Sequence, residues 1–375
     1  MKIGIFKETK EFEKRVAITP EVCKILISKG YECLVESGAG ENSFFSNQNY
    51  SEAGASISDK QSISNNCDII VKVNPFTKEE INALDKKVTC ISLMYAATQP
   101  DVIAALVAKG CSAFSVDAIP RISRAQKMDV LSSQANLAGY KSVIIGAYHL
   151  GKIFPLLMTA AGTIKPAKVV IMGAGVAGLQ AIATAKRLGA IVEVSDIRPE
   201  TKEQVESLGG KFIEMPKDES VKMEGGYVKG VSDDFLKKQQ EVLTKHFSEA
   251  DLIITTALIP GRKAPVLISE EQVSKMKTGS VIVDMAVEQG GNCASSEYGK
   301  VVVKNGVTIV GEANIPSMLP LNASELFAKN LLDFITHLTT KEGFKWEMDE
   351  EITKGSLMVH NGQIVHPSLN ISQAK

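Results

Sequence analysis

The segment from Ala167 to Asp196 restricts the fold of this chain more than any other part of the sequence. It begins with the apolar run AKVVIM, continues through Gly173, Gly175 and Gly178, and then shows a helical pattern. A second apolar run, IVEVS, follows and ends at Asp196. A strand, a glycine turn, a helix and another strand in this order are typical of a βαβ unit with parallel strands. The segment therefore predicts an α/β fold.

The same segment predicts a dinucleotide site. Gly173 would permit a tight turn, Gly175 would let main-chain N–H groups approach a pyrophosphate, and Gly178 would let the helix pack close to the sheet. Asp196 stands about 20 residues further on, where an acid bonds the adenosine ribose and repels the extra phosphate of NADP(H), so we expect NAD(H). Three neighbours complete these cofactor-binding candidates: Val176, Ile197 and Arg198. The alternative is an ordinary glycine-rich turn, with Asp196 capping a helix over Pro199–Glu206.

The rest of the chain continues the alternation of strands and helices. Predicted strands are Lys2–Phe6, Tyr31–Glu36, Asp68–Val73, Thr89–Leu93 and Cys111–Val116, then Ala167–Met172, Ile191–Ser195, Lys211–Ile213, Asp251–Ile254, Ser280–Asp284 and Val307–Val310. Predicted helices are Pro20–Lys29, Thr77–Leu84, Gln99–Lys109, 133–150 and Ser324–Leu338. At 375 residues the chain is long for a single core, so we expect two doubly wound parallel-sheet domains.

The two longest helices would carry the chain between these domains. We expect a first, Rossmann-like domain made of residues 1–136 and 331–375, with a Rossmann domain at 137–330 inserted into it. Gly139 and Gly146 in the first crossing helix leave room for close packing. The cleft between the two domains is the expected NAD(H) site.

Three further stretches follow predicted strands of the second domain, where doubly wound sheets bind ligands. They are TTALIPG at Thr255–Gly261, DMAVEQGG at Asp284–Gly291 and GEANIP at Gly311–Pro316. The cofactor-binding candidates in them are Ala257, Leu258, Glu288 and Asn314. Each stretch could equally be a structural turn.

A polar segment near the end of the first predicted domain supplies the catalytic candidates. It reads PRISRAQKMDVLSSQ, and its candidates are Arg121, Gln126, Asp129 and Ser132. A guanidinium or an amide can bind a carboxamide, and an aspartate can hold the arginine in place. On the residues alone, an exposed charged loop is the simpler interpretation.

Composition excludes several other classes of function. A formal net charge of -1, without a basic block, argues against a nucleic-acid partner. The six cysteines are spread singly, so no metal site is expected. The longest apolar region, 142–162, is interrupted by His149, Lys152 and Pro155, and the chain begins without the pattern of a signal peptide. We expect a cytoplasmic protein without a membrane segment of its own.

The motifs RISRAQ-x-MD-x-LSSQ-x-NLAGY, GGYVKGVSDDF, TTALIPG, VEQGGNC and LFAKNLLDF resemble the NAD(H)-binding component of proton-translocating transhydrogenases. The resemblance covers essentially the whole chain. It implies that Arg121, Gln126, Asp129 and Ser132 lie over the nicotinamide, and that Tyr227, on a mobile loop at Glu224–Phe235, closes over the nucleotide. It also implies a homodimer, held at the inner membrane by an NADP(H)-binding component and a membrane-embedded partner that couples hydride transfer to proton movement.

The same architecture resembles alanine dehydrogenase, which is the alternative function. Arg15 and Lys72 stand where that enzyme keeps its substrate cations, but Tyr95 occupies the place of its catalytic histidine and Glu288 that of its aspartate. Oxidation of an amino acid needs a general acid or base, whereas hydride transfer between two nicotinamides needs mainly positioning. The sequence therefore favours the transhydrogenase. A non-catalytic NAD-binding module would not need the polar segment.

Overall fold

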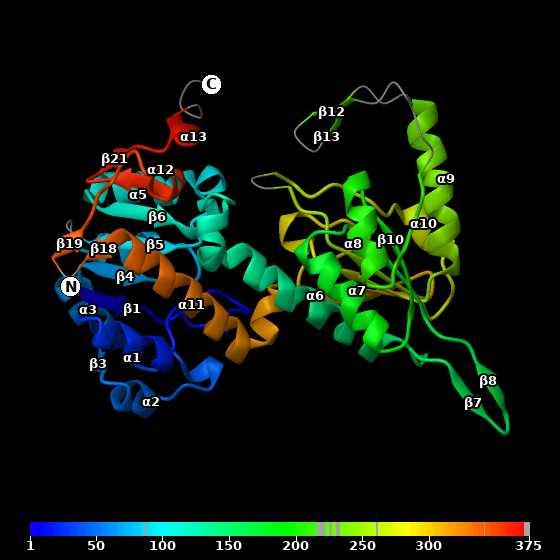
Figure 1. Ribbon diagram of the computed structural model, residues 1–375, viewed down its shortest axis with the longest axis horizontal. Coiled ribbons are helices and arrows are strands. Elements are labelled where there is room, and N and C mark those ends of the chain that lie inside the picture. The colour runs from blue at the N-terminus through cyan, green and yellow to red at the C-terminus, as the bar shows by residue number, and fades with distance from the viewer. Residues whose placement is uncertain are drawn as a thin grey trace. The chain divides into compact units, whose positions relative to one another are not determined.

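A computed structural model gives the fold of the chain (Figure 1), and it describes residues 1–85, 88–215, 222–224, 227–229, 233–259, 262–340 and 342–370. The chain forms two compact units. One contains Met1–Gln134 and Pro316–Lys375, and the other contains Ala135–Ile315. Each unit is built on its own parallel-dominated sheet, which confirms the predicted fold class.

The first unit has an eight-stranded sheet in the order β3-β2-β1-β4-β5-β6-β20-β21. Its parallel strands are β1 (Lys2–Ile5), β2 (Glu32–Glu36), β3 (Ser56–Ser58), β4 (Ile69–Val71), β5 (Thr89–Ser92) and β6 (Ser112–Ser115). Two antiparallel strands from the end of the chain extend it, β20 (Leu357–His360) and β21 (Gln363–Ile364). Central strands such as β4 are buried along their whole length, as expected for a parallel sheet that is covered on both faces.

Helices cover this sheet and form two apolar cores with it. They are α1 (Pro20–Ser28), α2 (Asn47–Glu52), α3 (Lys60–Asn66), α4 (Lys78–Ala83), α5 (Pro100–Lys109), α11 (Pro320–Leu338), α12 (Glu351–Ser356) and α13 (Pro367–Asn370), with a short hairpin of β18 (Thr339–Thr340) and β19 (Gly343–Phe344) after α11. Helix α11 contributes Phe327, Leu331 and Phe334 to the same core as Ile3 and Val71.

The second unit has a seven-stranded sheet in the order β11-β10-β9-β14-β15-β17-β16. Its parallel strands are β9 (Lys168–Met172), β10 (Ile191–Ser195), β11 (Lys211–Phe212), β14 (Leu252–Thr255), β15 (Val281–Asp284) and β17 (Val307–Gly311), and β16 (Lys300–Lys304) is antiparallel at the edge. Its helices are α7 (Val176–Arg187), α8 (Lys202–Ser207), α9 (Asp233–Glu249) and α10 (Glu270–Ser274). Two hairpins stand outside the sheet, β7 (Leu157–Thr159) with β8 (Gly162–Ile164) and β12 (Lys222–Glu224) with β13 (Tyr227–Lys229).

Helix α6 (Val130–His149) contains the boundary between the units. Within the second unit, a Cβ at Gly139 would overlap the carbonyl oxygen of Ala177, and one at Gly146 would press into Leu252. These glycines therefore allow α6 to pack directly on the first turn of α7 and on β14, the close packing that the sequence suggested.

The return from the second unit to the first differs from the expected boundary. It lies at Ile315 and not near Asn330, so residues 316–330 belong to the first unit. The predicted crossing helix, now α11, does not connect the units, because one whole face of it is buried in the first core. A run of leucine, phenylalanine and alanine marks a buried helix, but it does not show which core buries it.

Candidate functional site

The six parallel strands of the second unit end at the same edge of its sheet. Strand β9 pairs with β10 on one side and with β14 on the other, and β15 and β17 follow in order. The strand order therefore reverses at β9, and the crevice outside such a reversal is the ligand site of doubly wound folds. All three predicted loop stretches and the glycine loop begin at this edge.

The glycine loop has the local structure that its motif predicts. Gly173 has a φ of +107°, which strongly favours glycine. A Cβ at Gly178 would overlap the carbonyl oxygen of Gly173, so the third glycine lets α7 start against the strand. Gly175 is the N-cap of α7 and provides no side chain to cap it. The N–H groups of the first turn, beginning at Val176, are therefore not satisfied by a capping side chain and can bind an anion.

Asp196 follows β10, and its side chain binds the main chain of the glycine loop. Its carboxylate accepts hydrogen bonds from the N–H of Ala174 at 2.6 Å and of Arg198 at 2.8 Å, and from the Arg198 guanidinium at 3.0 Å. Burial alone would raise the pKa of Asp196, but the bonds from Arg198 and Ala174 outweigh it and lower the pKa below its usual range. Asp196 is therefore ionised at neutral pH and is paired with Arg198.

Apolar side chains lie exposed around this edge. Val176, Ile197 and Leu258 are 39%, 59% and 50% exposed, although they flank buried strands. Such side chains could cover the apolar faces of a bound dinucleotide. All three were predicted as cofactor-binding residues from their places in the loops.

The other predicted cofactor residues occupy different environments. Ala257 is half-buried, and its main chain is bonded to Asn292. Glu288 lies exposed in the short 3-10 helix Val287–Gln289. Asn314 is buried and has a left-handed φ of +51°, a conformation that is uncommon outside glycine and recurs at functional sites.

The four catalytic candidates lie in the first unit, around the 3-10 helix Ser123–Met128 and the start of α6. Arg121 and Gln126 are exposed, whereas Asp129 and Ser132 are half-buried. Asp129 precedes α6 and accepts hydrogen bonds from the N–H and the hydroxyl of Ser132, at 2.9 and 2.6 Å. The expected role of Asp129 as holder of Arg121 is thus replaced by a different one, because its carboxylate caps the first turn of α6.

The segment with Gln126 is held by the C-terminal part of the chain. The side-chain amide of Asn330, in α11, donates to the carbonyl of Lys127 at 2.7 Å and accepts from the hydroxyl of Ser133 at 2.7 Å. Arg124 also forms an ion pair with Glu350, directly before α12, at 2.9 Å. These contacts hold the segment on both sides of Gln126, whose own side chain is exposed to solvent.

Some predicted site residues lie wholly or partly outside what the structure describes. Tyr227 belongs to β13, where Glu224 pairs with it, but its side chain is not among the described ones. The other side chains of the Glu224–Phe235 segment also lie outside the described ones. The last two residues of the TTALIPG stretch, Pro260 and Gly261, are also outside the described residues.

The residues expected for an amino-acid substrate form a buried polar cluster in the first unit. The Arg15 guanidinium donates to Glu13 at 2.7 and 2.8 Å and to Gln134 at 2.9 Å, and Lys72 pairs with Glu80 at 2.8 Å. Burial would raise the pKa of Glu13, but the charge of Arg15 outweighs it and lowers the pKa to about 2. A substrate carboxylate would have to displace these internal partners, which disfavours such a site.

Tyr95, which stands in the place of the dehydrogenase histidine, lies at the surface of the first unit. It has a left-handed φ of +47°, its side chain is 41% exposed, and its N–H donates to Asp117 at 3.2 Å. The five histidines of the sequence lie elsewhere: His149 lies edge-on to Tyr148, His246 bonds Glu193, His337 bonds Glu350, and His360 and His366 flank β21. None of them belongs to the segments that carry the predicted site.

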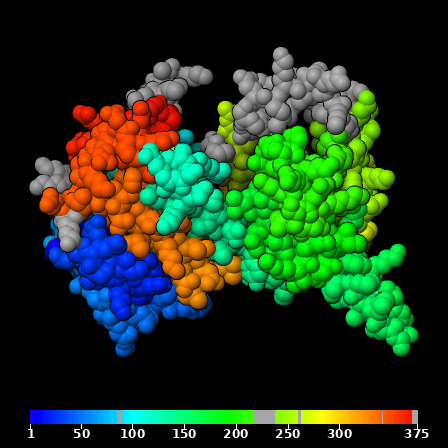
Figure 2. Space-filling model, in the orientation of Figure 1, coloured from blue at the N-terminus to red at the C-terminus, as the bar shows by residue number. Residues whose placement is uncertain are grey.

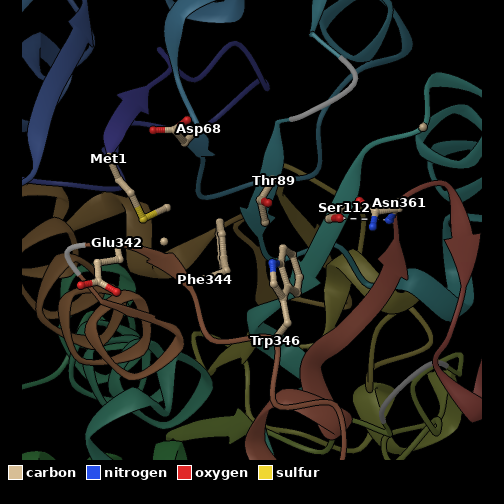
Figure 3. A pocket seen from close by; sticks show the side chains of 10 residues that line it. Met1, Asp68, Thr89, Ser112, Glu342, Phe344, Trp346 and Asn361 are labelled. Atoms are coloured by element: carbon tan, nitrogen blue, oxygen red, sulfur yellow. Dashed lines mark hydrogen bonds between the residues drawn. The ribbon is translucent and has the colours of Figure 1, made fainter.

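The first unit has a cavity of about 620 Å³ at the end of its sheet where the parallel strands begin (Figure 3). Met1, Asp68, Thr89 and Ser112 line it, and each stands at the beginning of a parallel strand or directly before one. Its aromatic wall is already stacked internally, since the rings of Phe344 and Trp346 lie 4.6 Å apart. Ligands of doubly wound sheets bind at the other end of the strands, so we assign this cavity no role.

Among the described residues, no His, Cys, Asp and Glu side chains gather in threes or more as the ligands of a metal ion would. Among the helices formed by these residues, none is both long and apolar enough to cross a bilayer.

The fold and the glycine loop together define the second unit as a dinucleotide-binding Rossmann unit. Two family descriptions match the chain, "Alanine dehydrogenase/PNT, N-terminal domain" over residues 4–138 and "Alanine dehydrogenase/PNT, C-terminal domain" over residues 142–367. The chain therefore belongs to the alanine dehydrogenase/PNT family.

Three relatives show where in this family the chain falls. It is 50% identical to the first part of the NAD(P) transhydrogenase subunit alpha of Rhodospirillum rubrum, over 98% of this chain and 99% of the relative. A crystal structure of transhydrogenase from Sinorhizobium meliloti superposes with a TM-score of 0.86 at 41% identity, covering 98% of this chain and 100% of that one. The alanine dehydrogenase of Bacillus subtilis is 29% identical, over 98% of this chain and 94% of the relative. The chain is thus more similar to these transhydrogenases than to that dehydrogenase.

Proposed function

We propose that this protein is the NAD(H)-binding subunit of a proton-translocating transhydrogenase. It holds NADH while a hydride passes directly to NADP⁺ on a separate component. The observation that carries the proposal is the intact dinucleotide edge, with its uncapped helix α7 and ionised Asp196, in a chain whose histidines all lie outside the predicted site. The 50% identity with a transhydrogenase subunit supports the same function.

The residues of the site fit this reaction. The first turn of α7 binds the pyrophosphate, and Asp196 accepts hydrogen bonds from the ribose. The exposed Arg121 and Gln126 orient the nicotinamide carboxamide through hydrogen bonds. The hydride leaves the dihydronicotinamide carbon with both electrons of its bond and forms a bond to the nicotinamide carbon of NADP⁺. Since no proton moves at either carbon, positioning takes the place of acid–base catalysis.

We propose that the acceptor nucleotide lies on an NADP(H)-binding partner, and that a membrane-embedded subunit couples the transfer to proton translocation. The name of the Rhodospirillum rubrum relative describes one portion of a subunit alpha, which supports a complex of several chains. In this arrangement the protein is cytoplasmic and is attached peripherally to the inner membrane through its partners.

We also propose a homodimer in which the β7–β8 hairpin contacts the second copy. The hairpin projects from the rest of the second unit (Figures 1 and 2). It and the residue before it expose Leu156, Leu157, Met158 and Ile164 at 42–72% of their surface. A narrow apolar projection of this kind is costly in water and is typical of a contact that a second chain buries.

The function is tested by stopped-flow measurement of hydride transfer from NADH to an NADP⁺ analogue. The purified chain is mixed with a soluble NADP(H)-binding component of the same family, and wild type is compared with Gln126→Asn. We expect rapid transfer that needs both proteins and is slowed in the variant without loss of NADH binding. Absence of transfer, together with turnover of alanine by the chain alone, would establish the dehydrogenase instead.

A further inference from the structure

One buried amide joins the loops that follow β14 and β15. Asn292 is fully buried, and its side-chain oxygen accepts a hydrogen bond from the N–H of Ala257 at 3.0 Å. Its side-chain nitrogen donates to the carbonyl of Ala257 at 2.9 Å and to that of Pro265 at 2.8 Å. Both main-chain polar groups of Ala257 are therefore bound by one side chain, which fixes the orientation of the loop at that residue.

Asp284 holds Asn292 from the other side. It is the last residue of β15, it is fully buried, and one of its oxygens accepts from the N–H groups of Asn292 and Cys293, each at 2.9 Å, and from the Ser296 hydroxyl at 2.6 Å. Its other oxygen accepts from the N–H of Ala286 at 3.0 Å and from the hydroxyl of Thr255 at 3.2 Å. A buried carboxylate with five donors is well compensated, so this part of the loop is rigid.

The network continues to the glycine loop. Thr256, which precedes Ala257, donates from its hydroxyl to the carbonyls of Met172 at 3.1 Å and Gly173 at 3.4 Å. Hydrogen bonds thus connect the end of β15, through Asn292 and the TTALIPG loop, to the turn that is expected to carry the pyrophosphate. All of these residues lie in the second unit, on either side of the reversal in strand order.

We propose that Asn292 is a positioning residue for the dinucleotide, which it never touches. By binding both polar groups of Ala257, it turns them away from the ligand and presents the exposed Leu258 side chain in their place. It also fixes the position of Thr256, whose hydroxyl binds the start of the glycine loop. This inference rests on the proposed function, because it assigns Asn292 to the NAD(H) site of that function.

The test compares Asn292→Asp and Asn292→Ser with a matched control, Gln272→Glu. The first variant removes both donated hydrogen bonds with little change of shape, and the second removes them without adding a charge. Gln272 is likewise buried in the second unit, and its amide nitrogen donates to Gln240 at 2.8 Å and Thr244 at 3.0 Å, away from the nucleotide loops. NADH affinity is measured by fluorescence titration, thermal unfolding by calorimetry, and hydride transfer by stopped flow at saturating NADH.

We expect both Asn292 variants to raise the Kd for NADH about tenfold or more, because the half-buried carbonyls of Ala257 and Pro265 lose the donor that binds them. The rate at saturating NADH should change by less than about twofold, because bound NADH meets the same reacting groups. Gln272→Glu should lower the unfolding temperature without changing the Kd. An unchanged Kd in the folded Asn292→Ser variant, or an equal rise in Gln272→Glu, would overturn the inference. Failure of the wild-type chain to bind NADH would instead refute the proposed function.

Discussion

We propose that the Asp196–Arg198 pair determines which dinucleotide this chain accepts, and Asp196→Asn is the perturbation that tests it. The carboxylate binds the Ala174 N–H and both the main chain and the guanidinium of Arg198. An asparagine can still accept from Ala174, so the glycine loop should keep its conformation. The substitution removes the negative charge and releases an arginine that is 41% exposed.

The magnitude follows from the charges at this position. A 2′-phosphate placed about 4 Å from the Asp196 carboxylate meets a repulsion of about 4 kcal/mol per pair of unit charges at an effective dielectric constant of about 20. That energy corresponds to roughly a thousandfold in Kd. For NADH, the loss of a hydrogen bond to a charged group costs about 1.5–3 kcal/mol. We therefore expect Asp196→Asn to weaken NADH binding about 10- to 100-fold and to bring NADPH binding to a similar affinity.

The assay is a fluorescence titration of the purified chain with NADH and NADPH at one fixed ionic strength, because salt screens exposed charges. Arg198→Ala alone should leave NADH binding nearly unchanged and NADPH still excluded. The double variant Asp196→Asn/Arg198→Ala should lose the NADPH affinity that the single Asp196→Asn variant gains, since a freed guanidinium binds a phosphate through paired donors.

Two results would refute this reasoning. If Asp196→Asn weakens NADH but gains no affinity for NADPH, the carboxylate is not what excludes the 2′-phosphate. If the double variant binds NADPH as tightly as Asp196→Asn does, the released Arg198 is not the group that receives it.

Three further predictions concern stability, capping and assembly. Burial raises the pKa of Glu8 from 4.5 to about 7, against the lowering effect of Lys72. The folded state thus holds this proton more tightly than the unfolded state, so the unfolding free energy should fall by an amount on the order of 3 kcal/mol as pH rises from 4.5 to 7. Denaturant titration at several pH values measures this fall, which should be absent in Glu8→Gln. Asp129→Ala should destabilise the chain by about 0.5–2 kcal/mol in chemical denaturation, because the first turn of α6 loses its cap. Asp129→Asn should keep both stability and hydride transfer, because asparagine also caps helices. Loss of hydride transfer alone in Asp129→Asn would show that the charge itself is needed. Met158→Asp should shift the proposed dimer towards monomer in analytical ultracentrifugation, and an undiminished dimer would exclude the β7–β8 hairpin from the interface.

Local pattern determined a large part of the fold. The five strands predicted in the first half of the chain and the six predicted in the second half are all present in the structure. Short apolar runs predict them because strands of a parallel sheet are buried on both faces. The sequence also predicted the conformation of the glycine turn. The positive φ of Gly173 and the close contact at Gly178 depend on residues only a few positions apart.

Tertiary structure decided what depends on residues distant in the chain. The pattern of α11 showed a buried helix, but only packing against β1 and β4 assigned it to the first unit. The sequence suggested that Asp129 holds Arg121, whereas the helical turn brings Ser132 to its carboxylate. Asn292 was not predicted at all, because its partners Ala257 and Pro265 stand 35 and 27 positions away. A hydrogen bond between loops depends on where two strand ends meet in a sheet, and that meeting is set by strand order and not by local sequence.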